Sequence, residues 1–197
     1  MKLSRRSVFS AAAAAAISLT HALATDAAGE MPIKGWVIAG SDPQEYEIGT
    51  THVAGVSGTC VFIKARTTSP SGFATLTQEI AADNYRGQRL RLSAQIKTDD
   101  AAAAQLWMRV DGPKRKILRF YNMGDRPVVG TTGWKRYDVV LDVPSDAVHV
   151  LFGYFLNGGG TVWSRDFKLE PVGKDVPVSV FPSKPLPKTP SNMNFDQ

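Results

Sequence analysis

Charged and amide side chains gather between Tyr121 and Pro144, in the stretch Y-N-M-G-D-R-P-V-V-G-T-T-G-W-K-R-Y-D-V-V-L-D-V-P. Such a cluster could serve a glycosidase, because paired carboxylates do the acid–base work of those enzymes. Asp138 with Asp142, and the neighbouring pair Asp99-Asp100, are the candidates by spacing. Carboxylates two or four residues apart along a strand, however, usually form a solvated face. We therefore interpret the cluster as a feature of the fold and not as a reaction centre.

Other catalytic chemistry lacks a matching set of residues. Beyond the first 24 positions only His52 and His149 remain, and neither has a histidine or cysteine at metal-ligand spacing. Cys60, the single cysteine, stands in an apolar run and predicts a buried strand residue; an intermolecular bridge or a reactive thiol is the alternative. The sequence contains no G-x-S-x-G elbow and no P-loop. We predict no metal, no cofactor and no enzymatic activity.

Binding has a stronger physical case, on the outward side of neighbouring strands. An exposed Trp107 with arginine and glutamine neighbours could stack a sugar ring and hydrogen-bond its hydroxyls. The alternative is that a loop or the C-terminal tail covers Trp107 and that the arginines are surface charge. By contrast, the neighbours of Trp36, Trp134 and Trp163 predict core positions for these residues. The predicted ligand-binding residues are Arg91, Gln95, Trp107, Arg109, Arg119 and Tyr121, bordered by Asn122 and Asp125.

Short strands must position these side chains. In Gln88–Asp99, residues Leu90, Leu92, Ala94 and Ile96 alternate with polar ones, which predicts one core face and one wet face. Ala104–Asp111 repeats the pattern, and Ala147–Asn157 is apolar on both faces, as in a central strand covered on each side. Glycine and proline punctuation separates these runs from further short strands. We expect about nine strands, none interrupted by a long helix, packed as two antiparallel sheets. The other expected strands are 35–41, 46–51, 60–66, 74–82, 116–122, 134–143 and 161–170.

The N-terminus predicts an export signal at residues 1–24. A basic start precedes an apolar stretch of about nine residues, far below the roughly 20 that span a bilayer, and Ala22-Leu23-Ala24 forms a cleavage site after Ala24. Ser4 and the pair Arg5-Arg6 resemble a twin-arginine translocation signal, which implies the translocation machinery as a partner. The general secretory route is the alternative. We expect a periplasmic or secreted bacterial protein that does not span the membrane.

The rest of the chain has a small net charge and a change of composition near its C-terminus. Of 23 basic and 18 acidic residues, three basic ones fall in the signal, which leaves a net charge of +2 and argues against nucleic-acid binding. We expect a short linker at 25–34, one β-sandwich domain at 35–172 and a proline-rich extension at 173–197. This extension holds five of the 12 prolines. It either runs along the sandwich, with Val180, Phe181, Leu186 and Phe195 as anchors, or is disordered.

Several segments together resemble the galactose-binding-like jelly rolls, a class that includes carbohydrate-binding modules. They include G-W-V-I-A-G-S-D-P-Q-E-Y-E-I-G, Y-R-G-Q-R-L-R-L-S-A-Q-I-K-T and G-T-V-W-S-R-D-F-K-L-E. The chain is also similar to a bacterial set of such domains, fused to transcriptional regulators or peptidases, through L-W-M-R-V-D-G and N-M-G-D-R-P. The resemblance covers residues 35 to about 172 and implies the jelly-roll fold.

The chain departs from these modules at two places. They often hold a structural calcium with Asp-Asp before an apolar residue, whereas here Arg165 precedes Asp166, which argues against that calcium. They also begin with an Asn-x-x-Phe-Glu strand, which residues 192–196 approximate at the other end of the chain. We expect that segment to supply an edge strand.

The function predicted from the sequence is an exported, non-catalytic module that binds a carbohydrate or another small polar ligand on one sheet face. The alternative is a structural or protein-interaction component of the cell envelope without a small ligand. The identity of the ligand and the oligomeric state stay open.

Overall fold

A computed structural model describes residues 33–53, 57–182 and 188–194 of the chain. The predicted signal, with Arg5, Arg6 and Ala24, lies outside these residues. The described part is built of strands and two short 3-10 helices and contains no α-helix. The elements are β1 (Val37–Gly40), η1 (Pro43–Glu45), β2 (Tyr46–Thr51), β3 (Cys60–Ala65), β4 (Phe73–Ala81), β5 (Arg89–Asp111), η2 (Pro113–Arg115), β6 (Ile117–Tyr121), β7 (Val128–Asp142), β8 (His149–Asn157) and β9 (Thr161–Val172).

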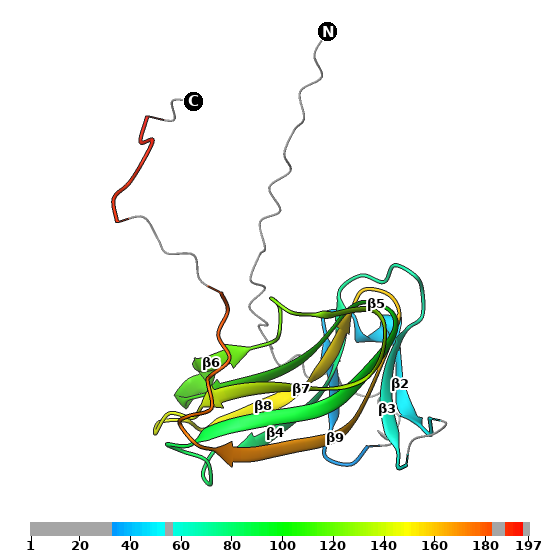
Figure 1. The fold of residues 1–197 in the computed structure, drawn as a ribbon, viewed down its shortest axis with the longest axis horizontal. Helices are drawn as coiled ribbons and strands as arrows, with labels where there is room; N and C mark the ends of the chain where they lie inside the picture. Colours follow the sequence, from blue (N-terminus) through cyan, green and yellow to red (C-terminus); the bar gives the residue numbers. More distant parts are fainter. Residues whose placement is uncertain (1–32, 54–56, 183–187, 195–197) are drawn as a thin grey trace. The chain divides into compact units, whose positions relative to one another are not determined.

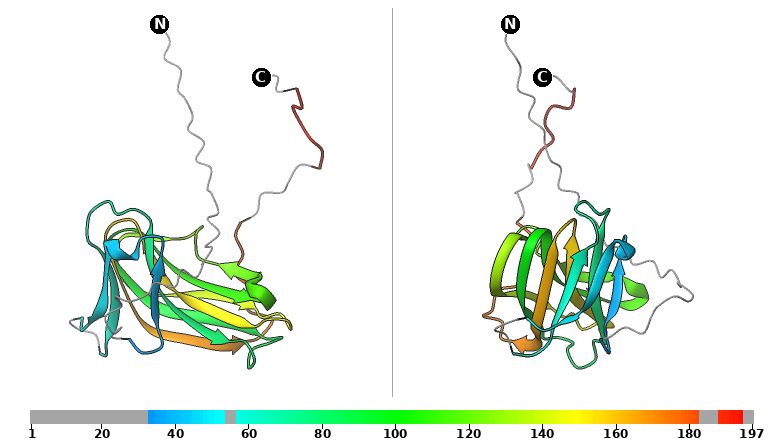
Figure 2. Two further views of the ribbon diagram at one scale, coloured as in Figure 1. Left: turned by 180° about the vertical axis from the view of Figure 1, so that it is seen from behind. Right: turned by 90° about the vertical axis from the view of Figure 1, so that its right-hand side faces the viewer.

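All nine strands pair antiparallel and form one curled sheet with two leaves (Figure 1). The first leaf has the order β7, the first half of β5, β9, β3 and β2. The second leaf has the order β6, the second half of β5, β8, β4 and β1. Figure 2 shows the curl of the sheet from two further sides. The predicted all-β, two-sheet antiparallel sandwich is confirmed.

The long strand β5 joins the leaves and corrects one expectation. Two strands were expected, 88–99 and 104–111, but β5 continues from Arg89 to Asp111, and both Asp99 and Ala101 pair with neighbouring strands. The backbone bends there, with Asp100 at φ 47°, and the β8–β9 turn packs against the bend. A Cβ on Gly160 would lie 2.2 Å from the Asp100 carbonyl oxygen, so only glycine fits this approach.

The core lies between the two leaves, where the alternation placed it. Leu90, Leu92, Ala94 and Ile96 are fully buried on the first half of β5, as predicted. Leu106, Met108 and Val110 are fully buried on the second half. Alternate residues of β8 enter this core, and the others, including Leu151 and Phe155, form a second apolar cluster on the opposite face. The expectation of a central strand covered on both sides is therefore confirmed. Cys60 is likewise a buried residue of β3.

The stretch 121–144 folds as a connection followed by β7. In this connection, Asp125 and Arg126 both bind the Tyr121 hydroxyl, which donates to Asp125 Oδ1 at 2.6 Å and accepts from Arg126 Nε at 3.1 Å. Strand β7 begins at Val128, before the expected Trp134, because Val128 and Gly130 still pair with β5.

The segment after β9 packs on the sandwich through its first residues. The Ser179 amide donates to the Val140 carbonyl at 2.8 Å, and the Phe181 ring centre lies 4.9 Å from that of Tyr121. Among the expected anchors, Val180 is largely exposed, and Leu186 and Phe195 lie outside the described residues. No strand forms over the described positions 188–194, and the rest of the predicted edge strand lies beyond them.

Candidate functional site

The predicted ligand-binding residues do not share one face. Arg91 and Gln95 point outward from the first half of β5, whereas Trp107 and Arg109 point outward from its second half. In both pairs, the outward residues alternate along β5 with residues that enter the core, as predicted. Because β5 passes from one leaf to the other, however, their outward directions belong to different sides of the sandwich. The prediction of a single joint face is therefore wrong.

Trp107 is 1% exposed, so the predicted open stacking surface does not exist there. Its Nε1 donates to Thr75 Oγ1 at 3.0 Å, so the indole reaches across β8 to β4. Leu151 and Phe155 of β8 bury it, with Phe73 and Phe120 beside them. The sequence indicated this second cluster, because the residues of β8 are apolar on both faces of the strand.

Arg109 is also buried, and its Nη2 donates to Asp111 Oδ2 at 2.8 Å. Asp111 is fully buried, so the two side chains form an internal ion pair and not surface charge. Such a pair is sensitive to the loss of either partner, because the remaining charge would stay desolvated. We therefore interpret Arg109 as a structural residue of the second leaf and not as a ligand-binding residue.

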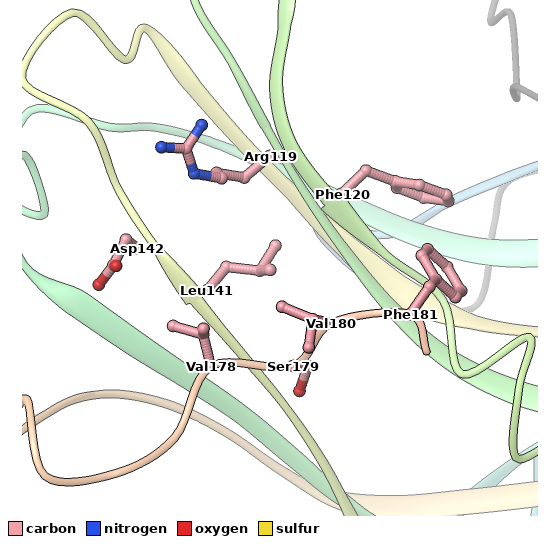
Figure 3. A pocket seen from close by; sticks show the side chains of 8 residues that line it. All are labelled: Arg119, Phe120, Leu141, Asp142, Val178, Ser179, Val180 and Phe181. Carbon is pink, nitrogen blue, oxygen red and sulfur yellow. The ribbon is translucent and has the colours of Figure 1, made fainter. Parts of the chain in front are cut away.

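The two predicted residues of β6 differ in exposure. Tyr121 points into the core at 2% exposure, and burial is the main cause that raises the pKa of its phenol. Arg119 is exposed and lines a pocket of about 390 Å³ between β6, β7 and residues 178–181 (Figure 3). Of the six predicted residues, Arg119 is thus the one that lines this pocket.

Arg91 and Gln95 remain on the outer surface of the first leaf, where each has polar partners. Arg91 donates to Glu170 Oε1 at 2.7 Å. Hydrogen bonds lower the pKa of the Glu170 carboxyl, and the bond from Lys168 has a larger effect than the bond from Arg91. The Gln95 amide donates to Asp166 Oδ2 at 3.2 Å and accepts from Arg165 Nη2 at 3.0 Å.

Two tryptophans that were expected in the core lie on this same outer surface. Trp163 of β9 pairs with Phe62 of β3 and with Lys97 of β5, and Lys97 Nζ lies 5.3 Å from its ring centre. The Arg165 guanidinium lies 5.0 Å from the ring centre of Trp134. Both tryptophans are partly exposed and belong to neither apolar cluster. We call Phe62, Lys97, Trp134, Trp163 and Arg165 the tryptophan face.

This face has the chemistry of a binding surface. Aromatic rings supply flat apolar area, and the adjacent cations and the Gln95 amide supply hydrogen bonds. In the described part of the chain no carboxylate forms an ion pair with Lys97. Arg165 lies 3.6 Å from the largely exposed Asp166. Sequence reasoning missed the face because Val162 and Phe167 make the flanks of Trp163 look like core.

The described residues contain neither a candidate metal site nor a candidate membrane-spanning helix. No group of three or more histidine, cysteine, aspartate or glutamate side chains could hold a metal ion there. The carboxylate of Asp166 faces Arg165 and Gln95. His149 is a partly exposed residue of β8, and its Nδ1 lies 2.8 Å from Glu79 Oε1. Over the same residues, no helix is both long and apolar enough to cross a bilayer.

Comparison with curated sequences finds a relative that is matched over most of this chain. No family model matches the chain. The chain is 40% identical over 176 residues to the uncharacterized HTH-type transcriptional regulator YbfP of Bacillus subtilis strain 168. The match covers 85% of this chain and 58% of that protein, so the chain spans little more than half of its relative. The described residues contain no α-helix, and hence no helix-turn-helix.

Solved structures share the fold at low sequence identity. The enzymatically active domain of tailspike protein 4 from bacteriophage CBA120 matches with a TM-score of 0.55 and 15% identity, over 71% of this chain and 20% of that one. The C-terminal family 22 carbohydrate-binding module of Clostridium thermocellum Xyn10B matches with a TM-score of 0.50 and 12% identity, over 74% and 90%. Identities this low show the fold alone. The chain thus has the β-sandwich fold found in carbohydrate-binding modules.

Proposed function

We propose that this chain is an exported, non-catalytic module that binds an acidic carbohydrate on the tryptophan face. The observation that carries the proposal is the placement of two partly exposed tryptophans, each with a cation at its ring, on one outer surface of the first leaf. The β-sandwich that this chain shares with a carbohydrate-binding module supports the proposal.

The chemistry of the face selects the class of ligand. Pyranose rings present apolar C–H faces that pack on indole, and their hydroxyls fit the Gln95 amide. Lys97 and Arg165 add positive charge at the two rings, and guanidinium binds a carboxylate through paired hydrogen bonds. A saccharide that carries carboxylate or sulfate groups meets all these features, whereas a neutral one leaves the cations unused.

Export and the absence of catalysis belong to the same proposal. Residues 1–24 support export through the twin-arginine machinery to the periplasm or beyond, and they lie outside the described residues. Paired hydrogen bonds from Arg89 lower the pKa of Asp142 to about 2, so this carboxyl is poorly suited to act as a general acid at neutral pH. In the candidate pair with Asp138, Asp142 is therefore unsuited to the part of a glycosidase's general acid, which needs a raised pKa.

The test is calorimetric titration of the purified chain with hexasaccharides of uronic acids, sulfated sugars and neutral sugars. We expect an acidic hexasaccharide to bind, and Trp163→Ala to weaken its Kd at least tenfold, which corresponds to about 1.4 kcal/mol. Phe181→Ala is the matched control, because this aromatic ring lies on the pocket near β6 and should leave saccharide binding unchanged. Equal binding of single-stranded DNA would indicate unspecific polyanion attraction and contradict the proposal.

A second candidate is a protein-interaction component, and the edge strand β1 favours it. Val37 and Ile38 of β1 are 57% and 38% exposed, and β1 ends the strand order of the second leaf. Exposed apolar edge strands pair readily with other chains. If no saccharide binds, while Ile38→Asp abolishes association with a purified envelope partner, this second function would replace the first.

A further inference from the structure

The pocket between β6, β7 and the C-terminal segment is a second candidate binding site. Its volume of about 390 Å³ is at the small end of the range of small-ligand pockets. It is lined by Arg119 and Phe120 of β6, Leu141 and Asp142 of β7, and residues 178–181. The tryptophan face contributes none of these residues, so the pocket is independent of the proposed saccharide site.

The C-terminal wall of the pocket is held by specific contacts. Besides the Ser179 amide bond to Val140, the Val140 amide donates to Ser179 Oγ at 3.0 Å. Upstream, Arg89 Nη1 donates to the carbonyl oxygens of Lys174 at 2.9 Å and Val176 at 2.5 Å. These bonds fix the segment on both sides of Val178, so the pocket has a defined wall.

The pocket has one polar end and one aromatic end. In Figure 3, Arg119 and Asp142 lie toward one side, Phe120 and Phe181 toward the other, with Leu141 between them. Arg119 is the cationic side chain of a lining whose other residues are mainly apolar. The shape and lining fit a small molecule with one charged group and one aromatic or branched apolar body.

The charge balance decides the sign of that group. Asp142 is engaged by Arg89, at 2.9 and 3.1 Å, and by Lys174 Nζ at 3.0 Å, so two cations neutralise its carboxylate. Arg119 donates to the Leu118 carbonyl at 2.6 Å, and no carboxylate of the described residues forms an ion pair with it. The pocket therefore has an excess of positive charge, which favours an anionic group.

We propose that this pocket binds a small aromatic carboxylate, with the carboxylate on Arg119 and the ring between Phe120 and Phe181. Arginine is suited to this role because its planar fork matches the two oxygens of a carboxylate. The ligand would also pack against Val178 and Val180 and would hold the C-terminal segment on the sandwich.

The test uses the full chain and three probes of one size: phenylacetate, phenethyl alcohol and phenethylamine. We expect calorimetry to show phenylacetate binding at least tenfold more tightly than the alcohol, and the amine more weakly still. Arg119→Gln should reduce phenylacetate affinity to that of the alcohol and leave alcohol affinity unchanged. Arg66→Gln is the matched control, an exposed arginine after β3 that does not line the pocket.

Two results would overturn the proposal. One is equal affinity for the acid and the alcohol, and the other is no measurable binding of any probe by the wild type. Unfolding curves of each variant check that the fold is intact, and Phe181→Ala should weaken all three probes together because it removes the shared aromatic wall. Trp163→Ala should not change phenylacetate binding, so failure of the saccharide site and failure of this pocket can be told apart.

Discussion

Replacing Trp107 with phenylalanine should lower the free energy of unfolding by about 2–3 kcal/mol and leave saccharide binding unchanged. The lost bond from Nε1 to Thr75 accounts for about 1 kcal/mol. The Thr75 hydroxyl is not orphaned by the change, because it still donates to the Tyr154 carbonyl at 3.0 Å. The smaller ring leaves a gap between Leu151 and Phe155, which adds roughly 1–2 kcal/mol.

Urea unfolding at equilibrium, followed by fluorescence and circular dichroism, measures this loss as a lower midpoint with an unchanged slope. Trp107→Ala should cost more, about 3–5 kcal/mol. The partly exposed Trp163→Phe is the matched comparison and should cost less than about 1 kcal/mol. If Trp107→Phe kept the wild-type midpoint but abolished saccharide binding, Trp107 would be a ligand residue, and its assignment to the second apolar cluster would be wrong.

Three further predictions concern charge and backbone. Asp142→Asn should cost about 1 kcal/mol near neutral pH, since the full shift of its pKa from 3.8 to about 2 must be discounted for solvent screening. The folded-state pKa of Asp142 is lowered, so this contribution is present above about pH 4 and is lost as the pH falls through about 2; a constant difference from pH 6 to pH 2 in urea midpoints would contradict it. Gly160→Ala should destabilise by more than about 1 kcal/mol, measured by thermal unfolding, because the added Cβ would meet Asp100 and the backbone is left-handed there. Lys97→Gln should weaken an acidic hexasaccharide about threefold to tenfold and flatten its salt dependence in calorimetry, with neutral sugars unaffected.

The alternation of side chains was enough to predict the inward residues of β5. Every second residue from Leu90 to Ile96, and again from Leu106 to Val110, lies in the core as expected, because a period of two leaves little choice about which residues face apolar surroundings. The same alternation says only that Gln95 and Trp107 face away from the core. It does not say that the strand between them bends at Asp100 and changes leaf.

The assignment of the four tryptophans shows the second limit. Trp36 packs against Phe152 and Phe167, as its apolar neighbours predicted, whereas Trp134 and Trp163 are on the outer surface beside cations. What distinguishes these cases is the cross-strand neighbour. Trp163 lies beside Lys97, which is 66 residues away in the chain, and no local pattern reports such a pairing.

Cross-strand pairing also decides which tryptophan is available for a ligand. Trp107 pairs with Gly153 on β8, and its ring therefore reaches across β8 to Thr75 without an intervening side chain at that register position. Trp163 pairs with Lys97 and Phe62, whose side chains stand on the same surface and leave the ring partly exposed. The residue opposite each tryptophan, small in one case and long or aromatic in the other, thus determines whether the indole becomes part of the sheet packing or part of a binding face.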